Sequence, residues 1–473
     1  MQSVERAAAR RRLRRRDAES DRRRLPDPGR PPGTDLVPEI RHIVLLMMEN
    51  HSFDNYLGSL GRGDGLPTPV PVNCRRDGNP IAAHEMTSTA QRPNAPSQSW
   101  HETHAQYADG RNDGFVTSAE RVEPDGDASL AMGYWSEQHL PFYASLARTF
   151  PLADRWFSSC LGPTFPNRRF LMAATANGLV DDAMASVIDY PPTGTIFDLL
   201  DRHDISWTNY HHVRRHRRIA PRFTGGPGRK AVRAGRLTAK GLGAGEVVRG
   251  RIECTANLYP LPLLRSMRHL RPISRLFQDA AEGTLPAVSI VDPDFDAASE
   301  ENPQDVQIGE GFAAAVINAI MRGPAWRNTL LIWFYDEHGG YYDHVAPPPA
   351  VEPDDVLPHS LLDARAPLHW ALRHTRMWRR AKQDDAGASH DRYDRYGIRV
   401  PAVVVAAHAR PDYVSSTVFD HTSALKLIEE KWNLPPLTER DAHAQAPWDL
   451  LDLDHPPAFY PAPDLAVPAR PWQ

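Results

Sequence analysis

Four short runs of apolar residues along this chain end abruptly in polar residues. Each run is apolar at nearly all of its positions rather than at every second one, and the four are Ile43 to Met48, Pro286 to Val291, Leu330 to Tyr335 and Val400 to Ala407. Strands that are buried on both faces show this pattern, whereas half-exposed strands alternate. The runs therefore predict central strands of a parallel sheet that helices cover on both faces.

Helix-like segments lie between these runs. Residues Gly311 to Arg322 are amphipathic and stop before a Gly-Pro pair, and Thr422 to Trp432 has Thr422 as a candidate cap and Asn433 at its close. Strands alternating with helices predict an α/β fold with a doubly wound, mostly parallel central sheet and helices on both faces. Ligands bind such sheets at the carboxyl ends of the strands, so the polar residues after the runs are expected to meet at one edge.

The chain predicts one folded domain with a tail and two insertions. Residues 1–37 are basic, with six arginines in the seven positions 10–16, and a block of like charge is typical of a disordered tail. Contact of this tail with anionic lipid or nucleic acid is the alternative. We assign residues 38–473 to a single domain, with long loop insertions near 214–251, which is rich in Gly and Arg, and near 357–394, which is charged.

The composition is that of a soluble globular protein, with 41% apolar and 24% charged residues. A formal net charge of -4 gives no reason to expect a specific nucleic acid partner. Cys74, Cys160 and Cys254 lack metal-type spacing, and their odd number argues against a disulfide framework. No apolar run approaches the ~20 residues of a membrane span. As written, the chain is expected to be cytoplasmic, and exported only if its start misplaces or truncates a signal.

The ends of the first and third apolar runs carry the strongest chemical signal. Glu49 and Asn50 follow the first run directly, and Asp336 and Glu337 follow the third, before a pair of glycines. Carboxylates beside a core are costly unless a cation binds them. Oxygen ligands favour Mg, Mn or Ca, and the adjacent His338 leaves Zn open. These strand ends predict a site for a divalent metal ion.

A candidate nucleophile lies in the segment GPTFPNRRF, residues 162–170. Pro166 suits a first helical turn, which places Thr164 at the N-terminus of a helix, where free N–H groups and the helix dipole attract phosphate. Arg168 can add positive charge. A threonine hydroxyl is a poor nucleophile unless a metal ion or a base lowers its pKa, and a metal ion on the strand-end carboxylates would do so.

Helix capping is the alternative role for both groups. Asn50 or Ser52 could cap a helix that begins near Phe53, and Thr164 could be a plain N-cap. Histidines add further candidates, although a histidine in polar company is more often a hydrogen-bonded residue than a ligand. Four are singled out because they lie in polar or acidic segments: His104, His338, His344 and His421.

Six segments follow one another in an informative order. They are RHIVLLMMENHSFDNYLG (41–58), GPTFPNRRF (162–170), VDPDF (291–295), TLLIWFYDEHGGYYDHVAPP (329–348), YGIRVPAVVV (396–405) and VFDHTSALKLIEEKWNLPPLTERDA (418–442). From about residue 40 to 450 the chain thereby resembles the bacterial phosphoesterase family, which contains phosphatidylcholine-preferring phospholipases C and acid phosphatases. The patterns ENxSFD and DExGGxxDHV are specific. The resemblance implies an alkaline-phosphatase-like fold and a phosphoric ester hydrolase.

The resemblance also implies roles for the residues at matching positions. Those expected to bind the metal ion (Ca, Mg, Mn or Zn) or the phosphate are Glu49, Asn50, Asp336 and Glu337. Thr164 would attack phosphorus, and water would then hydrolyse the phosphothreonine. Asn50, Arg168 and the helix N-terminus would steady the charge on the phosphoryl oxygens, and His104 and His338 complete the expected catalytic set.

Two departures from the family pattern affect the expected rate. Gln98 and Asn302 stand where the family usually has histidines, whose loss would weaken protonation of the leaving group, a step worth roughly 10²–10⁴ in rate. His101, His211 or His338 could substitute.

Three functions follow from this sequence. The first is a phospholipase C-like hydrolase that acts on a small phosphoester or a phospholipid head group, with peripheral membrane contact left open. The alternatives are an acid phosphatase acting on phosphomonoesters and a catalytically weak relative that binds a phosphorylated ligand. A sulfatase is disfavoured because the Cys/Ser-x-Pro-x-Arg motif is absent: residues 164–168 only echo its spacing. The oligomeric state is left undetermined.

Overall fold

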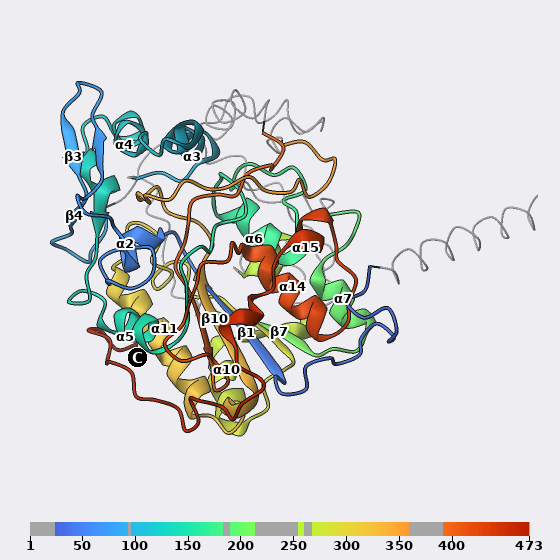
Figure 1. Ribbon diagram of the computed structural model, residues 1–473. Coiled ribbons are helices and arrows are strands. Elements are labelled where there is room, and N and C mark those ends of the chain that lie inside the picture. Colours follow the sequence, from blue (N-terminus) through green and yellow to red (C-terminus); the bar gives the residue numbers. More distant parts are fainter. Residues whose placement is uncertain are drawn as a thin grey trace, which may run out of the picture.

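A computed structural model describes residues 24–92, 96–182, 190–212, 254–259, 267–358 and 391–472, and Figure 1 shows their arrangement. The predicted insertion at 214–251 and most of that at 357–394 lie outside these residues, as do residues 1–23 of the predicted tail. Within the described part, none of the helices combines the length and the apolar character that a bilayer crossing requires.

An eight-stranded sheet forms the centre of the molecule, in the order β12-β6-β11-β10-β1-β9-β7-β8. Neighbouring strands are parallel except at β11, which is antiparallel to both β10 and β6. The strands are β1 (His42–Met48), β6 (Leu152–Ala153), β7 (Trp207–His211), β8 (Leu270–Pro272), β9 (Val288–Val291), β10 (Thr329–Tyr335), β11 (Ala402–Ala406) and β12 (Val414–Ser415). The predicted mostly parallel sheet is confirmed.

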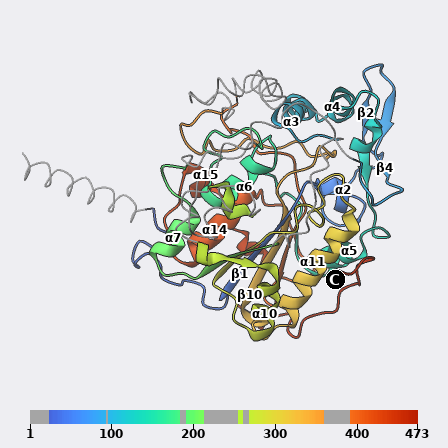
Figure 2. The same cartoon turned by 180° about the vertical axis from the view of Figure 1, so that it is seen from behind.

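Helices cover both faces of this sheet, as Figures 1 and 2 show from opposite sides. One layer contains α6 (Thr164–Ala173), α7 (Ile196–Arg202), α14 (His421–Lys431) and α15 (Glu439–His443). The other contains α5 (Pro141–Thr149), α10 (Ile273–Glu282) and α11 (Val306–Arg322). A smaller group lies beyond the carboxyl edge, with α2 (Phe53–Leu57), α3 (Trp100–Tyr107), α4 (Phe115–Val122), β2 (Val72–Cys74), β3 (Pro80–Ala82), β4 (His84–Glu85) and β5 (Gly133–Tyr134). The doubly wound α/β architecture is therefore confirmed.

The register of the central strands brings their carboxyl ends to one level. In β1 every residue after His42 is buried, which is why the sequence there is apolar without alternation. Met48 of β1 pairs with Tyr335 of β10, so the next residues, Glu49 and Asp336, leave the sheet side by side. On the other side of β1, strand β9 ends at Val291.

Strand β11 runs against the predicted direction. The sequence predicted it as another parallel strand, but Leu330 pairs with Ala406 and Phe334 with Ala402 in antiparallel register. The polar residue that follows the run, His408, therefore lies at the opposite edge from Glu49. A fully buried strand has the same apolar composition in either direction, so the run could not specify its orientation.

Several local boundaries also differ from expectation, and α11 begins at Val306 rather than at Gly311. Helix α14 begins one residue earlier than predicted, because Asp420 and Ser423 form a capping box in place of a Thr422 cap. Part of the predicted tail is folded, since residues 24–37 lie along the end of α14. The Leu36 N–H donates to the Lys431 carbonyl at 2.7 Å, and the Lys431 ammonium binds Asp35 at 2.6 Å.

A buried carboxyl in α14 makes stability depend on pH. The Glu429 side chain is buried, and the carboxyl group of Asp441 in α15 lies beside it. Burial, and next the neighbouring Asp441 carboxylate, raise the pKa of Glu429 well above its usual range. The folded state therefore keeps a proton that the unfolded chain releases above pH ~4.3, so this group lowers stability as pH rises from there toward its folded pKa.

We expect Glu429→Gln to remove the loss of stability that this carboxyl group causes as pH rises. Melting temperatures at pH 5 and pH 8 should show a gain of about 2 °C or more at pH 8 and a smaller gain at pH 5. The exposed Glu282→Gln should change neither value. An equal or larger gain for Glu429→Gln at pH 5 would contradict the explanation.

Candidate active site

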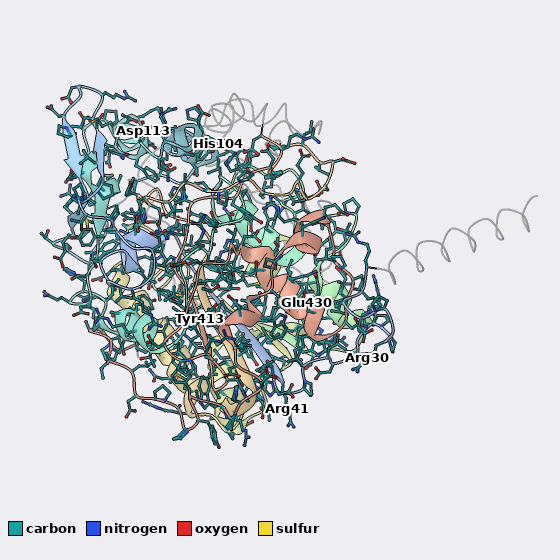
Figure 3. The ribbon with its side chains drawn as sticks, in the orientation of Figure 1. Arg30, Arg41, His104, Asp113, Tyr413 and Glu430 are labelled. Carbon is teal, nitrogen blue, oxygen red and sulfur yellow. The ribbon has the colours of Figure 1, made fainter. Side chains whose placement is uncertain are left out.

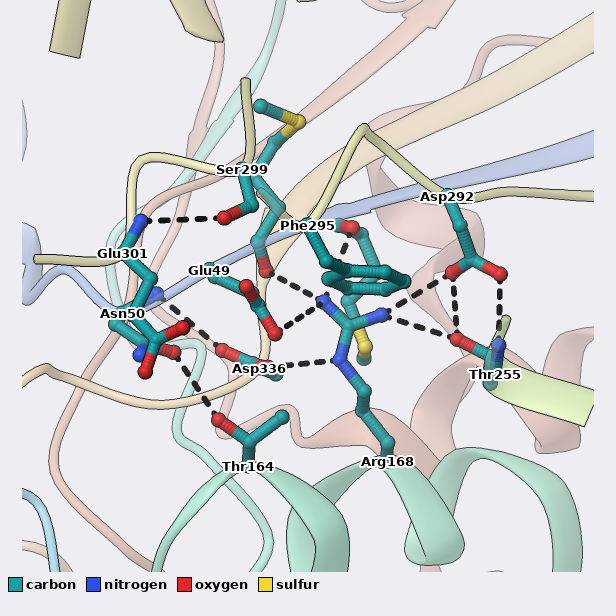
Figure 4. Close-up of polar contacts among 12 residues, drawn as sticks. Glu49, Asn50, Thr164, Arg168, Thr255, Asp292, Phe295, Ser299, Glu301 and Asp336 are labelled. Atoms are coloured by element: carbon teal, nitrogen blue, oxygen red, sulfur yellow. Dashed lines mark hydrogen bonds and ion pairs between the residues drawn. The ribbon is translucent and has the colours of Figure 1, made fainter. Parts of the chain in front are cut away.

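Two acidic strand ends meet at the carboxyl edge of the sheet, as the sequence predicted. The Asn50 N–H donates to Asp336 Oδ1 at 3.3 Å, so the turn after β1 is tied directly to the end of β10. Asn50 has a φ of 73°, a left-handed conformation that asparagine tolerates better than most residues. This turn directs the Asn50 side chain toward α6 (Figure 4).

The glycines after Glu337 are required by close backbone packing. Gly339 and Gly340 have φ values of 65° and 79°. A Cβ atom at position 339 would clash with the Asn50 carbonyl, and one at position 340 would lie 2.6 Å from the Ser97 carbonyl oxygen. The two glycines therefore form a sharp turn, which packs the β10 end against the β1 end.

Thr164 faces these strand ends from the first turn of α6. Its hydroxyl donates to Asn50 Oδ1 at 3.3 Å. The capping alternative is confirmed for Ser52, which caps α2 by accepting from the Asn55 N–H, whereas Asn50 does not cap that helix and Pro163 rather than Thr164 is the N-cap of α6. The side chains of Asn50 and Thr164 therefore face one another across the carboxyl edge of the sheet.

Arg168, one turn further along α6, holds the carboxylates together. Its Nε–H donates to Asp336 at 2.8 Å, and Nη1 donates to Asp292 at 3.2 Å and to the Thr255 hydroxyl at 3.0 Å. Its Nη2 donates to the carbonyls of residues 47 and 48 at 3.4 and 3.2 Å. All five N–H groups of the guanidinium are thus used within the protein. In this arrangement Arg168 acts on the site through Asp336 rather than by direct contact with a ligand.

Asp292, at the end of β9, anchors the other side of Arg168. Besides the guanidinium it accepts from the Thr255 N–H at 2.7 Å, from the Thr255 hydroxyl at 2.6 Å and from Asn209 Nδ2 at 2.8 Å. Figure 4 shows Arg168 between this group and Asp336. Three strand ends, those of β1, β9 and β10, therefore converge on one buried cation.

The remaining carboxyl groups suit a further cation. Burial raises the pKa of Glu49 and Glu337 well above the usual range, and it raises the pKa of Asp336 against the opposing effect of Arg168. Glu49 Oε2 and Glu337 Oε1 are buried and have no hydrogen-bond partner among the described residues. Oxygen atoms of this kind are the ligands that hard divalent cations prefer. The predicted metal ligands therefore offer oxygen atoms of a suitable kind, although among the described residues only a different group brings three ligand atoms within 4.8 Å of one another.

That other group of side chains lies on α2 and in the segment that follows the β10 end. Among the described residues, Asp54, Asp343 and His344 place their ligand atoms within 4.8 Å of one another. Arg399, however, donates to Asp343 Oδ1 and to Asp54 Oδ1, each at 3.1 Å. Because a guanidinium already supplies positive charge there, we interpret this group as a buried ion-pair network.

Three of the four predicted histidines form hydrogen bonds with residues other than Thr164. His104 lies on α3 (Figure 3), with Nδ1 2.7 Å from the Trp100 carbonyl and Nε2 2.6 Å from Asp391. His338 is fully buried, with Nε2 2.7 Å from Gln106 Oε1, and burial lowers its pKa to about 3. His344 belongs to the Arg399 network described above.

The fourth histidine supports the strand end itself. His421 Nε2 lies 2.7 Å from the carbonyl oxygen of Asp336, so the neutral ring donates to it. Burial lowers the pKa of His421 to about 4, which keeps the ring neutral at physiological pH. Both His338 and His421 are therefore placed beside Asp336 and Glu337 but cannot act as cationic acids at neutral pH.

Two carboxyl groups near Thr164 were missed by the sequence reasoning. Asp182 Oδ1 accepts from the Phe165 N–H at 2.8 Å, so it binds the N-terminus of α6, where the sequence predicted phosphate. Glu301 lies beside Asn50 and Glu49 (Figure 4), and burial and then Asp336 raise its pKa to about 7. Glu301 directly precedes Asn302, a departure from the family pattern, and this adjacency was the available signal.

The chain also matches known proteins along most of its length. This chain is 27% identical to the non-hemolytic phospholipase C of Pseudomonas aeruginosa over 424 aligned residues. The alignment covers 84% of this chain but only 54% of that protein. Non-specific phospholipase C6 of Arabidopsis thaliana is 27% identical over 87% of this chain and 72% of its own length. Phospholipase C B of Mycobacterium tuberculosis is 28% identical over 84% of this chain and 74% of its own length.

The family assignment rests on a broader match than these pairwise identities. The sequence model of the Phosphoesterase family matches residues 40–435, which include Glu49, Thr164, Arg168 and both residues of the β10 end. The chain therefore belongs to the phosphoesterase family, and its predicted class, a hydrolase of phosphoric esters, is confirmed at the level of that family.

Proposed function

We propose that this chain hydrolyses phosphoester bonds with Thr164 as the nucleophile. In the first step the Thr164 oxygen forms a bond to phosphorus, the bond from phosphorus to the substrate alcohol breaks, and the alcohol leaves with a proton. In the second step water attacks the phosphothreonine and releases the phosphate product. The observation that carries the proposal is the hydroxyl of Thr164, 3.3 Å from Asn50 Oδ1 at the start of α6.

A divalent metal ion would be held by the predicted set of Glu49, Asn50, Asp336 and Glu337. Such an ion would lower the pKa of a nearby hydroxyl and offset negative charge on the phosphoryl oxygens. Because burial raises the pKa of Glu49 and Glu337, these carboxyls must lose protons to bind it. We therefore infer that metal affinity increases with pH.

The relatives support phospholipase C activity, with a phospholipid as the substrate class. Proteins named phospholipase C align over more than four fifths of this chain. A phospholipid head group would then be the substrate, and the protein would reach it by peripheral contact with a membrane. Hydrolysis of phosphomonoesters, as in an acid phosphatase, is the alternative for the same nucleophile.

A catalytically weak, phosphate-binding relative is the second candidate. It is favoured by Gln98 and by Asn302, whose Oδ1 accepts from the Tyr341 hydroxyl at 3.1 Å. Neither residue can protonate a leaving group. Glu301, whose pKa is raised to about 7, is the neighbouring group that carries a proton over part of the neutral range.

A substrate panel with and without a chelator separates these possibilities. We expect hydrolysis of p-nitrophenyl phosphorylcholine, a loss of about 10²-fold or more with EDTA, and recovery with Mn²⁺, Ca²⁺, Mg²⁺ or Zn²⁺. Faster hydrolysis of p-nitrophenyl phosphate would instead favour the phosphatase. Tight binding of inorganic phosphate without hydrolysis of either ester would support the weak relative.

A further inference from the structure

A buried carboxyl, Glu300, lies beside the site without contacting Thr164. It is inaccessible to solvent, and its nearest polar partners are tyrosine hydroxyls. Tyr143 donates to Oε1 at 2.6 Å, Tyr56 donates to Oε2 at 2.8 Å, and Tyr335 donates to Oε2 through a short hydrogen bond. These tyrosines come from α5, α2 and β10, so one carboxyl joins three separate elements.

The partners of Glu300 are next to the site residues in the chain. Tyr335 is the last residue of β10 and directly precedes Asp336. His51 directly follows Asn50, and its Nε2 lies 3.1 Å from the Glu300 carbonyl oxygen. Both acidic strand ends are therefore connected to Glu300 through the residue beside them.

The β1 end has a second connection to the same loop. The Glu49 N–H donates to the carbonyl of Ser299, the residue before Glu300, at 3.0 Å. The residue after Glu300 is Glu301, whose side chain lies beside Asn50 in Figure 4. The loop thus contacts the β1 end on one side of Glu300 and presents a carboxyl group to the site on the other.

The backbone at Glu300 has an uncommon conformation that accompanies this arrangement. Its φ of 79° is left-handed, a conformation that glutamate rarely adopts and that costs free energy. Gly309 in α11 makes room for it, because a Cβ atom at that position would clash with the Glu300 side chain. Burying a carboxyl without a cation is also costly, and burial raises the pKa of Glu300 to about 8 while the tyrosine hydroxyls oppose the shift. If position 300 had only to fill space in the core, an apolar residue would do so without these costs.

We propose that Glu300 is a positioning residue that sets the geometry of both acidic strand ends and of Glu301. It holds Asp336 through Tyr335, and it holds the Glu49-Asn50 turn through His51 and the neighbouring Ser299. This inference rests on the proposed function, since the geometry it sets is that of the Thr164 site.

Two tyrosine variants test this proposal as a matched pair. Tyr335→Phe and Tyr143→Phe each remove one hydroxyl that donates to Glu300 and keep the ring, but only Tyr335 adjoins a site residue. Both should lose similar stability. We expect Tyr335→Phe to lower kcat on p-nitrophenyl phosphorylcholine by about tenfold with KM nearly unchanged, and Tyr143→Phe to stay within about threefold of wild type.

Hydrogen exchange gives a readout that does not depend on turnover. Amides in residues 49–53 and 336–340 should exchange faster in Tyr335→Phe than in Tyr143→Phe. Equal exchange at these residues in the two variants would overturn the proposal, as would equal kcat values per folded molecule. If the wild type hydrolyses no ester, the proposed function fails by itself, and the exchange comparison still decides whether Glu300 positions the strand ends.

Discussion

Replacing Thr164 by alanine is expected to lower kcat for phosphoester hydrolysis by about 10³-fold or more while leaving the fold intact. The hydroxyl donates a single hydrogen bond, to Asn50 Oδ1, and Pro163 rather than Thr164 caps α6, so its removal leaves the helix unchanged. Steady-state kinetics with p-nitrophenyl phosphorylcholine measure the loss, and circular dichroism measures the fold.

The conservative variant separates the nucleophile from a merely nearby hydroxyl. Thr164→Ser keeps the oxygen and should keep kcat within about tenfold of wild type. Thr117→Ala serves as the control and should have full activity. It removes a hydroxyl on α4 that donates a hydrogen bond to the Gly114 carbonyl. Rapid quenching followed by mass spectrometry should find phosphate on the peptide that contains Thr164. Wild-type kcat in Thr164→Ala would show that Thr164 is not the nucleophile.

The second large effect concerns stability. Arg168→Met should lower the free energy of unfolding by about 3–5 kcal/mol, because it leaves Asp336 and Asp292 buried without their cation. The loss of stability should be larger at pH 8 than at pH 5. At pH 5, protonation can neutralise part of the negative charge that is left buried without its cation. Urea unfolding at both pH values measures it.

A double variant tests whether uncompensated charge is the cause. Asp292→Asn removes one of the two carboxylates in close contact with Arg168, so the Arg168→Met/Asp292→Asn double variant should be less destabilised than the sum of the two single variants. Arg327→Met, at an exposed position, should change the free energy of unfolding by no more than about 0.5 kcal/mol. Full stability of Arg168→Met would contradict the role of Arg168 as the cation that holds the strand ends.

Local sequence pattern was sufficient for the main elements of the site. Continuous apolar runs predict strands that are buried on both faces, and parallel strands end at the same edge, so Glu49 and Asp336 could be placed together before any contact was known. Pro166 placed Thr164 at a helix start for a reason that is also local. The same reasoning could not orient β11, because burial on both faces selects apolar residues whichever way a strand runs.

Side-chain partners far apart in the chain were decided by the tertiary structure alone. His104 and His338 have acidic or polar neighbours in sequence, yet their hydrogen bonds go to Asp391 and Gln106, 287 and 232 positions away. Local context could not reveal these partners, and so it could not separate a structural histidine from a catalytic one.

What the sequence determined by itself is therefore the central parallel strands, their carboxyl edge and the residues Glu49, Asn50, Thr164 and Asp336 that reach it. Only the tertiary structure decided which partners the neighbouring side chains bind and which of them hold other residues in place. Arg168 has all of its donors directed into the protein, and Glu300 gathers hydroxyls from three elements. The physical reason is that a periodic pattern reports burial and direction of the backbone, whereas hydrogen-bond partners depend on how separate elements pack.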